Sequence, residues 1–420
     1  MRAQIDTGGL LQFITGKKEQ SPTVLLEYTL DQNIDKDRLQ NALERALDVF
    51  ALFKVRIVLT DQKMPLYEDN PNRPQVYEYD RQQHFFGKES EGYLFRLYYS
   101  EDKVILSAHH MLSDFHGLYN FMKCILGFYF EIDQSGLIDL DPSDTRDPYE
   151  LFRSKEQPSL SRSGKWKNEI IIPHEMKFHR GERTDYSRLS FSLSEILSRT
   201  KKAESSVFPF FSWIISKAIA KEYDGKDLSI LGCGGFDCRS IFGSKTPRCF
   251  SHSFITVLHP HEQNMDIEQQ LTIQKARMFL ELDEGTIAND IALRKESADT
   301  KMRQLDKFIL DQDALDIKRK QASQQIAFFH SYTGSLDDAA GLARYIKDID
   351  LHMAVTRNPI VAETYSRYDN IYCTLEETGV MRSIVPAMME VADENGISCS
   401  LIGSGKLCVD TFPMEELFDD

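Results

Sequence analysis

Two adjacent histidines and an aspartate follow an apolar stretch, in residues 108–114 (AHHMLSD). A histidine side chain changes protonation near neutral pH, so it can take a proton from a hydroxyl or amine that attacks a carbonyl. The aspartate, four residues after His110, can hold that histidine in one tautomer, cap a helix or pair with a buried arginine. These residue types and spacings predict proton-transfer chemistry.

The flanking residues must position these side chains. Residues 103–108 (KVILSA) predict a short buried strand, and residues 118–126 (LYNFMKCIL) predict an apolar helix. The histidines therefore lie in a strand-to-helix turn, where a rigid scaffold can hold a side chain in a cleft. Successive side chains of a strand point to opposite faces. We therefore expect His110 to be the general base and His109 to be structural.

The composition narrows the class of protein. The chain has 420 residues, of which 41% are hydrophobic, and this length indicates two domains. A net charge of −15 argues against a general nucleic-acid binder. The seven cysteines form no CxxC pair, so we expect neither a disulfide framework nor a zinc site. With no signal peptide and no run of transmembrane length, we expect a cytoplasmic protein without a membrane span.

Strands and helices alternate over the first ~130 residues, which predicts an α/β layer architecture. Residues 23–30 and 53–59 are predicted strands, and Asp35 should cap a helix that buries Leu39, Leu43, Leu47 and Phe50. A stretch rich in proline, serine and charge follows from about residue 131 to 186. We therefore predict a first domain over residues 1–150, a crossover over 151–187 and a second domain over 188–420.

The second half is predicted to continue the alternation. A helix over residues 267–282 and another over 295–309 should follow two strands, and Pro386 should kink or restart a closing helix over 380–391. The other expected elements are a helix over 207–220 and strands at 189–193, 228–235, 254–258, 326–329, 352–355 and 370–374.

The doubled-histidine segment, residues 109–114, resembles the HHxxxD signature of the coenzyme A-dependent acyltransferase superfamily. That superfamily includes chloramphenicol acetyltransferase, the condensation domains of nonribosomal peptide synthetases, and the alcohol and polyketide-associated acyltransferases. Residues 92–99 resemble the hairpin before the motif, and residues 34–43 and 53–56 the first helix and next strand. The order of elements is similar over most of the chain.

The resemblance implies two chloramphenicol-acetyltransferase-like αβ-sandwich domains with an active-site cleft or tunnel between them. It implies His110 as catalytic base, no permanently bound cofactor, and acyl-CoA or an acyl-phosphopantetheine as co-substrate. In the superfamily the aspartate makes a salt bridge that shapes the site. Arg56 resembles the arginine of that pair, and otherwise it is an ordinary surface residue of a strand. We therefore predict a buried Asp114–Arg56 ion pair.

One departure from the family pattern follows the aspartate. The family commonly has glycine there, whereas Phe115 and His116 precede Gly117 in this chain. Phe115 would narrow or shift the substrate channel. His116 is a second candidate base, although its spacing fits no family role. Gly117 is expected to shape the site with Asp114.

A second segment resembles plant and fungal relatives, in which a strand ending in Asp-x-Arg leads to a proline loop and a Gly-Asn pair. Asp237 and Arg239 match the first part, and we interpret them as an ion pair that holds a loop. Ser251 and His252 replace the Gly-Asn pair and are candidates to donate a hydrogen bond to substrate or oxyanion. Ser331 lies in a turn where condensation-like relatives place serine or asparagine.

Two other motifs are weaker. His259 and His261 flank a proline after a strand, which indicates a loop more than a metal site, and no metal is expected. Residues 232–235 (GCGG) lack the lysine and serine of a phosphate-binding loop.

Two functions remain open. The chain is either an acyltransferase, moving an acyl group from a CoA or carrier-protein thioester to a small alcohol or amine, or a catalytically silent condensation-like protein that only binds a carrier or small ligand. His110 favours the enzyme, whereas Phe115 and the missing Gly-Asn pair favour the silent protein. An acyl carrier protein is thus a candidate partner, and nucleic acid is not.

Overall fold

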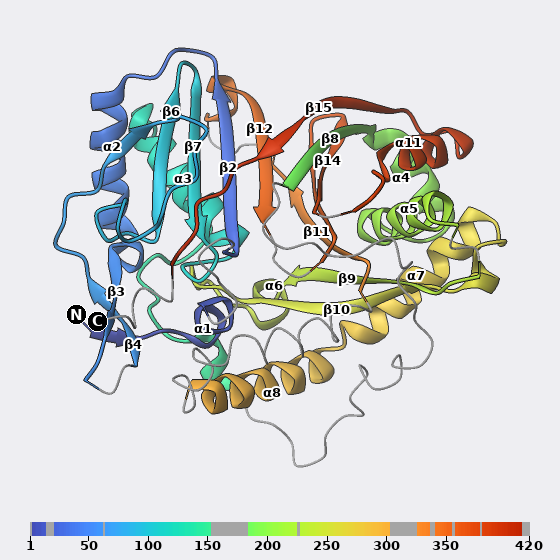
Figure 1. Ribbon diagram of the computed structural model, residues 1–420, viewed down its shortest axis with the longest axis horizontal. Helices are drawn as coiled ribbons and strands as arrows, with labels where there is room; N and C mark the ends of the chain where they lie inside the picture. The colour runs from blue at the N-terminus through green and yellow to red at the C-terminus, as the bar shows by residue number, and fades with distance from the viewer. Residues whose placement is uncertain are drawn as a thin grey trace.

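Two large β-sheets, one built mainly from each half of the chain, form the framework of the computed structural model (Figure 1). The structure describes residues 2–13, 21–61, 64–152, 184–224, 227–302, 326–336, 341–354, 358–378 and 380–413. The first sheet, as far as these residues show it, contains β12 (Ile346–Ala354), β2 (Thr23–Leu30), β7 (Lys103–His109), β6 (Phe95–Ser100) and β5 (Val76–Glu78), in that order.

The second sheet is larger and mixes parallel with antiparallel pairs. In the described part of the chain its order is β10 (Ser251–Leu258), β9 (Ile230–Asp237), β11 (Phe328–Ser335), β13 (Ile360–Arg367), β14 (Asn370–Glu377), β8 (Thr184–Ser192) and β15 (Cys399–Leu407). A small antiparallel sheet joins β1 (Arg2–Gln4), β4 (Pro65–Asp69) and β3 (Val55–Leu59).

Helices flank both sheets, and each sheet has its own apolar core. Leu26, Leu106 and Phe121 are fully buried in the first core, and Phe191 and Phe211 in the second. The described helices are α1 (Thr7–Phe13), α2 (Lys36–Val49), α3 (Phe115–Tyr129), α4 (Leu193–Lys202), α5 (Val207–Glu222), α6 (Arg239–Phe242), α7 (Ile267–Glu281), α8 (Glu284–Met302) and α11 (Val385–Glu394). This arrangement confirms the predicted α/β class.

Local sequence signals explain most elements of the first half. The Asp35 side chain accepts a hydrogen bond from the Arg38 backbone N–H and caps α2, whose buried side chains include Leu39, Leu43 and Leu47, as predicted. The predicted strand at 103–108 is confirmed as β7. The helix after the motif begins at Phe115, three residues earlier than predicted, because Asp114 caps it.

In the second half two strands were not predicted, β13 and β15. Pro386 lies in the first turn of α11, so it starts this helix and does not kink it. Helix α8 begins at Glu284, well before the predicted residue 295, and the end of that predicted helix lies outside the described residues.

Two segments from the second half of the chain pair with its first half. Strand β12 pairs with β2 in the first sheet, although the sequence placed residues 188–420 in the second domain. Thr411 also bridges to Phe85 in the first half. The predicted domain limits therefore do not follow the sheets, and most of the predicted crossover, residues 153–183, lies outside the described residues.

Candidate active site

A cavity of about 590 Å³ lies between the two sheets. His110 and Phe115 line it from the end of β7 and the start of α3, and α1 contributes Gly8. One face of the second sheet forms the opposite wall, with Cys233, Gly235, Asp237, Ser251, Ser253, Phe329, Ser331 and Glu363. The cleft predicted at the domain seam is therefore present and contains His110.

Hydrogen bonds fix the tautomer of His110. Its backbone N–H donates to the Pro22 carbonyl over 2.7 Å, which anchors the turn after β7. Its Nδ1 lies 3.0 Å from the Ser113 carbonyl oxygen. Because a carbonyl only accepts, the proton is on Nδ1 and the lone pair is on Nε2. Burial lowers the pKa of His110 below the usual 6.5, so the imidazole is neutral at neutral pH.

His109 points away from the cavity into the first core, as the strand alternation predicted. Its Nδ1 accepts from the Met111 backbone N–H over 3.0 Å. The rings of Phe86 and Phe412 pack edge-on against the imidazole. Burial lowers its pKa to about 3, so it does not titrate near neutrality. These contacts suit a structural residue.

Asp114 pairs with Arg239 across the two halves of the chain. Its Oδ2 and Oδ1 accept from Arg239 Nη1 and Nη2, each over 2.9 Å. The same carboxylate accepts from the backbone N–H groups of Gly117, over 3.2 Å, and Phe250, over 2.8 Å. Arg239 lowers the pKa of this buried carboxyl against the effect of desolvation. Asp114 is thus both a helix cap and half of a bidentate ion pair.

The prediction that Arg56 pairs with Asp114 is wrong. Arg56 lies on β3 and donates to Glu68 on the neighbouring strand β4, with Nη2 2.6 Å from Oε2. Its side chain is 40% exposed. A charged residue on a small peripheral sheet pairs with its cross-strand neighbour. It therefore matches the alternative, an ordinary surface strand residue.

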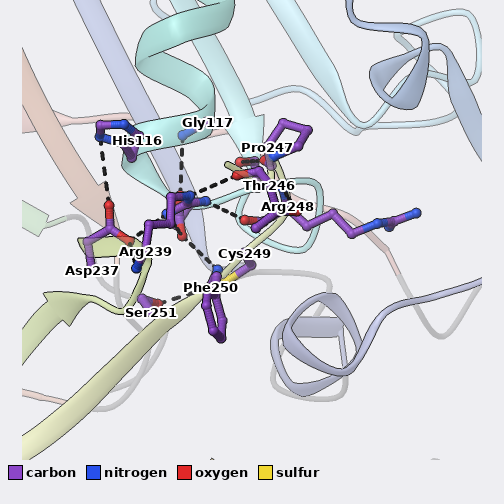
Figure 2. Close-up of polar contacts among 12 residues, drawn as sticks. His116, Gly117, Asp237, Arg239, Thr246, Pro247, Arg248, Cys249, Phe250 and Ser251 are labelled. Carbon is purple, nitrogen blue, oxygen red and sulfur yellow. Dashed lines mark hydrogen bonds and ion pairs between the residues drawn. The ribbon is translucent and has the colours of Figure 1, made fainter. Parts of the chain in front are cut away.

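Arg239 uses all five of its N–H hydrogens. Besides its two bonds to Asp114, Nη1 donates to Asp237 Oδ1 over 2.8 Å and Nε to the Thr246 carbonyl over 2.8 Å. Nη2 also donates to the Arg248 carbonyl. Thr246, Pro247 and Arg248 form the loop that curves around the guanidinium in Figure 2. The predicted role of Asp237 and Arg239, holding a loop, agrees with these contacts, and Asp114 joins them.

Close backbone contacts keep the two loops together. A Cβ on Gly117 would collide with Ser113 Oγ and the Pro247 carbonyl oxygen, so the first turn of α3 requires glycine. Ser113 Oγ donates to the same carbonyl over 2.5 Å.

Helix α1 also packs against the site, a feature that sequence reasoning missed. A Cβ on Gly9 would lie 2.6 Å from the Met111 carbonyl oxygen, and one on Gly8 would collide with the Cys249 carbonyl oxygen. Asp6 and Arg248 form a buried ion pair of 2.7 Å that holds the helix there. The only sequence signal was the Gly8–Gly9 doublet.

Phe115 is one of the residues that line the cavity. Its ring stacks on Tyr119, one helical turn later, with centroids 5.6 Å apart. His116, the rival base, lies 3.2 Å from Asp139 Oδ2 and 3.8 Å from Asp237 Oδ2. Figure 2 shows it beside Asp237, at the edge of the Arg239 cluster. His116 is therefore placed between two carboxyl groups at the edge of the site.

The remaining predicted residues, Ser251, His252 and Ser331, all line the cavity. Ser331 lies within β11, so the prediction that it lies in a turn is wrong. His252 is buried, its Nε2 lies 3.7 Å from Asp290 Oδ2, and burial lowers its pKa. Cys249, which was not predicted, has its Sγ 4.0 Å from His110 Nδ1. Burial raises the pKa of this thiol, so it stays protonated and is a poor nucleophile.

In the parts of the chain that the structure describes, no group of three His, Cys, Asp or Glu side chains is placed to hold a metal ion. The Nδ1 atom of His259 instead forms a hydrogen bond with Ser229 Oγ, 3.0 Å away, and His259 caps a short helical turn. The described helices include none that is long and apolar enough to cross a membrane.

The solved structures that this fold matches include acetyltransferases and domains of peptide synthetases. No family model matches the chain, and neither does the sequence of any curated protein. TRI101 of F. sporotrichioides, complexed with coenzyme A and T-2, is 10% identical with a TM-score of 0.61, over 96% of this chain and 100% of that one. TRI3 trichothecene 15-O-acetyltransferase from Fusarium sporotrichioides is 9% identical with a TM-score of 0.62, over 93% and 94%.

The epimerization domain from the third module of tyrocidine synthetase B is 11% identical with a TM-score of 0.61, over 94% and 95% of the two chains. The chain has the condensation-domain-like acyltransferase fold. This confirms the predicted two-domain architecture. Because this fold is shared by acetyltransferases and an epimerization domain, the reaction must be argued from the site.

Proposed function

We propose that this protein is an acyltransferase in which His110 is the general base. The observation that carries the proposal is the tautomer of His110. The Ser113 carbonyl holds the proton on Nδ1, which leaves Nε2 as the basic atom of a side chain that lines the cavity. Burial keeps this imidazole neutral at neutral pH, and a general base must be neutral before it acts.

In the proposed reaction, a hydroxyl or amine of a small acceptor attacks the carbonyl carbon of a thioester. His110 Nε2 takes the proton from the attacking group as the new bond forms. The tetrahedral intermediate then collapses, the C–S bond breaks, and the imidazolium returns the proton to the thiolate. The negative charge of Asp114 favours the protonated imidazole, which stabilises the state between these two steps.

The donor is proposed to be acyl-CoA or a carrier-protein thioester, since both present the same phosphopantetheine thioester. TRI101 was crystallised with coenzyme A, and this supports the CoA donor. Ser251 and His252 are proposed to contact the substrate, because they line the cavity in the place where relatives have their Gly-Asn pair.

The enzyme is favoured over a silent binding protein. Two features favoured silence, the missing Gly-Asn pair and the bulk of Phe115 next to the motif. Its ring stacks along α3 on Tyr119, and about 590 Å³ of cavity remains. That volume lies within the usual range of small-molecule sites, ~300–1,000 Å³.

The test is thiol release from a panel of acyl-CoAs in the presence of small alcohols and amines. His110→Ala should lower turnover by ~10²–10⁴-fold, the span of a lost general base. Because burial lowers the pKa of His110, the acid limb of kcat/KM should fall below pH 6.5, the usual histidine value.

His109→Ala is the matched control, because it removes an imidazole of the same size from the opposite face of the strand. It should reduce folding yield and leave the turnover of the folded protein largely intact. An inactive but folded His109→Ala beside an active His110→Ala would refute the assignment.

A further inference from the structure

One row of the second sheet carries polar side chains along the cavity wall. Ser253, Gly235, Ser331 and Glu363 are register neighbours on β10, β9, β11 and β13. Side chains at matched register point to the same face of a sheet, and all four residues line the cavity. Glu363 is the acidic member of this row, and the proposed reaction does not use it.

Glu363 is a buried carboxyl with unused hydrogen-bonding capacity. The residue is 2% exposed. Its Oε1 has no hydrogen-bond partner among the residues that the structure describes. Burial, followed by the charge of Glu376, raises the pKa of Glu363 well above its usual value, while Ser331 acts in the opposite direction. An unsatisfied buried acid destabilises a fold, so its place in a cavity wall points to a ligand.

The charges behind Glu363 favour a cation. His352 Nδ1 lies 3.6 Å from Glu376 Oε1, and His352 Nε2 lies 3.4 Å from Asp350 Oδ2. Asp350, though opposed by burial, raises the pKa of His352 to about 10, so this histidine is charged. Arg188 binds Asp348 over 2.5 Å and lies 3.5 Å from Asp350.

Two cations in this cluster, Arg188 and His352, thus face three carboxyl groups, those of Asp348, Asp350 and Glu376. Among these groups, Glu376 is the one whose charge raises the pKa of Glu363. A positive group placed against Glu363 would be attracted by the carboxylates of Glu363 and Glu376, whereas an anion would be repelled.

We propose that Glu363 binds a positively charged nitrogen of the acyl acceptor, which makes the acceptor an amino alcohol or a diamine. This inference rests on the proposed acyl transfer, because the bound molecule is an acceptor only in that reaction. The group that attacks the thioester at His110 must be uncharged, so the cation at Glu363 is a second, non-reacting group of the same molecule. On binding, the carboxylic acid loses its proton to solvent and the resulting carboxylate pairs with the ammonium.

The test is calorimetric binding without any acyl donor, using three pairs of probes. These are benzylamine and benzyl alcohol, hexylamine and hexanol, and ethanolamine and ethylene glycol. For at least one pair the amine should bind the wild-type protein at least ~10-fold more tightly than the alcohol, and Glu363→Gln should abolish that preference. Titrations in phosphate and in Tris should show proton release on amine binding, because the pKa of Glu363 is raised in the free protein.

Glu68→Gln, at the exposed ion pair with Arg56, is the control and should leave amine binding unchanged. Circular dichroism and the melting temperature report whether Glu363→Gln is folded. Equal binding of amines and alcohols by the wild type, or amine binding unaffected in folded Glu363→Gln, overturns the proposal. Tighter alcohol binding by the wild type also overturns it and assigns a protonated, hydrogen-bonding Glu363. Glu363-dependent amine binding without thiol release would refute the acyl transfer alone.

Discussion

Replacing Asp114 with asparagine tests how much the ion pair across the two halves stabilises the fold. The carboxylate accepts four hydrogen bonds, two from Arg239 and one each from the backbones of Gly117 and Phe250. Asparagine has the same shape as aspartate but only one acceptor oxygen. Its NH₂ group would therefore face N–H donors that the carboxylate of Asp114 accepts from. It also leaves the Arg239 guanidinium, 5% exposed, without its main counter-charge. Breaking one partner of such a pair costs ~3–5 kcal/mol.

The assay is the free energy of unfolding from urea denaturation, followed by circular dichroism. Glu68→Gln is the matched control, because it breaks an Arg–carboxylate pair whose arginine is 40% exposed. Exposed pairs contribute only ~0.2–1 kcal/mol. Arg239→Met and the double variant complete a cycle, in which the double variant should lose less than the sum of the singles. Equal losses in Asp114→Asn and Glu68→Gln, or strictly additive losses in the cycle, would refute the reasoning.

Two further predictions concern buried residues. Burial lowers the pKa of His330 to about 3, whereas an unfolded histidine titrates near 6.5. Below pH 6.5 the unfolded chain therefore binds a proton that the native protein does not, and stability falls as the pH falls. At about pH 4.5 this difference in proton binding lowers the free energy of unfolding by about 3 kcal/mol. Urea denaturation at pH 7 and 4.5 should therefore show that His330→Gln loses about 3 kcal/mol less than the wild type between these two pH values. Gly117→Ala should destabilise by ~1–3 kcal/mol because its Cβ collides with Ser113 and Pro247, whereas Gly285→Ala, whose Cβ has an ordinary contact, should be neutral or stabilising in thermal melts. An unchanged melting temperature in Gly117→Ala would contradict the contact argument.

Local signals predicted the elements around the motif because they act within a few residues. Asp35 caps α2 through the N–H three residues on, and the apolar run at 103–108 forms β7. The opposite directions of His109 and His110 followed from strand geometry. Strand β13 escaped prediction because it is buried along its whole length, and so shows no alternation of polar and apolar residues.

Long-range pairing could not be predicted in the same way. Arg56 lies on β3 and Arg239 begins α6 just after β9, and only the assembled sheets decide which arginine reaches Asp114. The sequence identified Arg239 as a loop-holding residue but gave no reason to bring it to a carboxylate 125 positions away. Glu363 carried no signal at all, since its chemistry depends on burial beside Glu376 and on register with Ser331.

Strand β12 and Phe412 come late in the chain but pack against its first half, so the first sheet can be completed only late in synthesis. In the described part of the chain, Phe412 completes the enclosure of His109 that Phe86 begins, and β12 is the outer neighbour of β2. A ribosome that has released the motif must still synthesise about 300 residues, which takes ~15–60 s, before that enclosure can form. We therefore expect the motif segment of a nascent chain stalled before Ile346 to be cleaved readily by protease. Protection in such a stalled chain would show that the first sheet closes without its late partners.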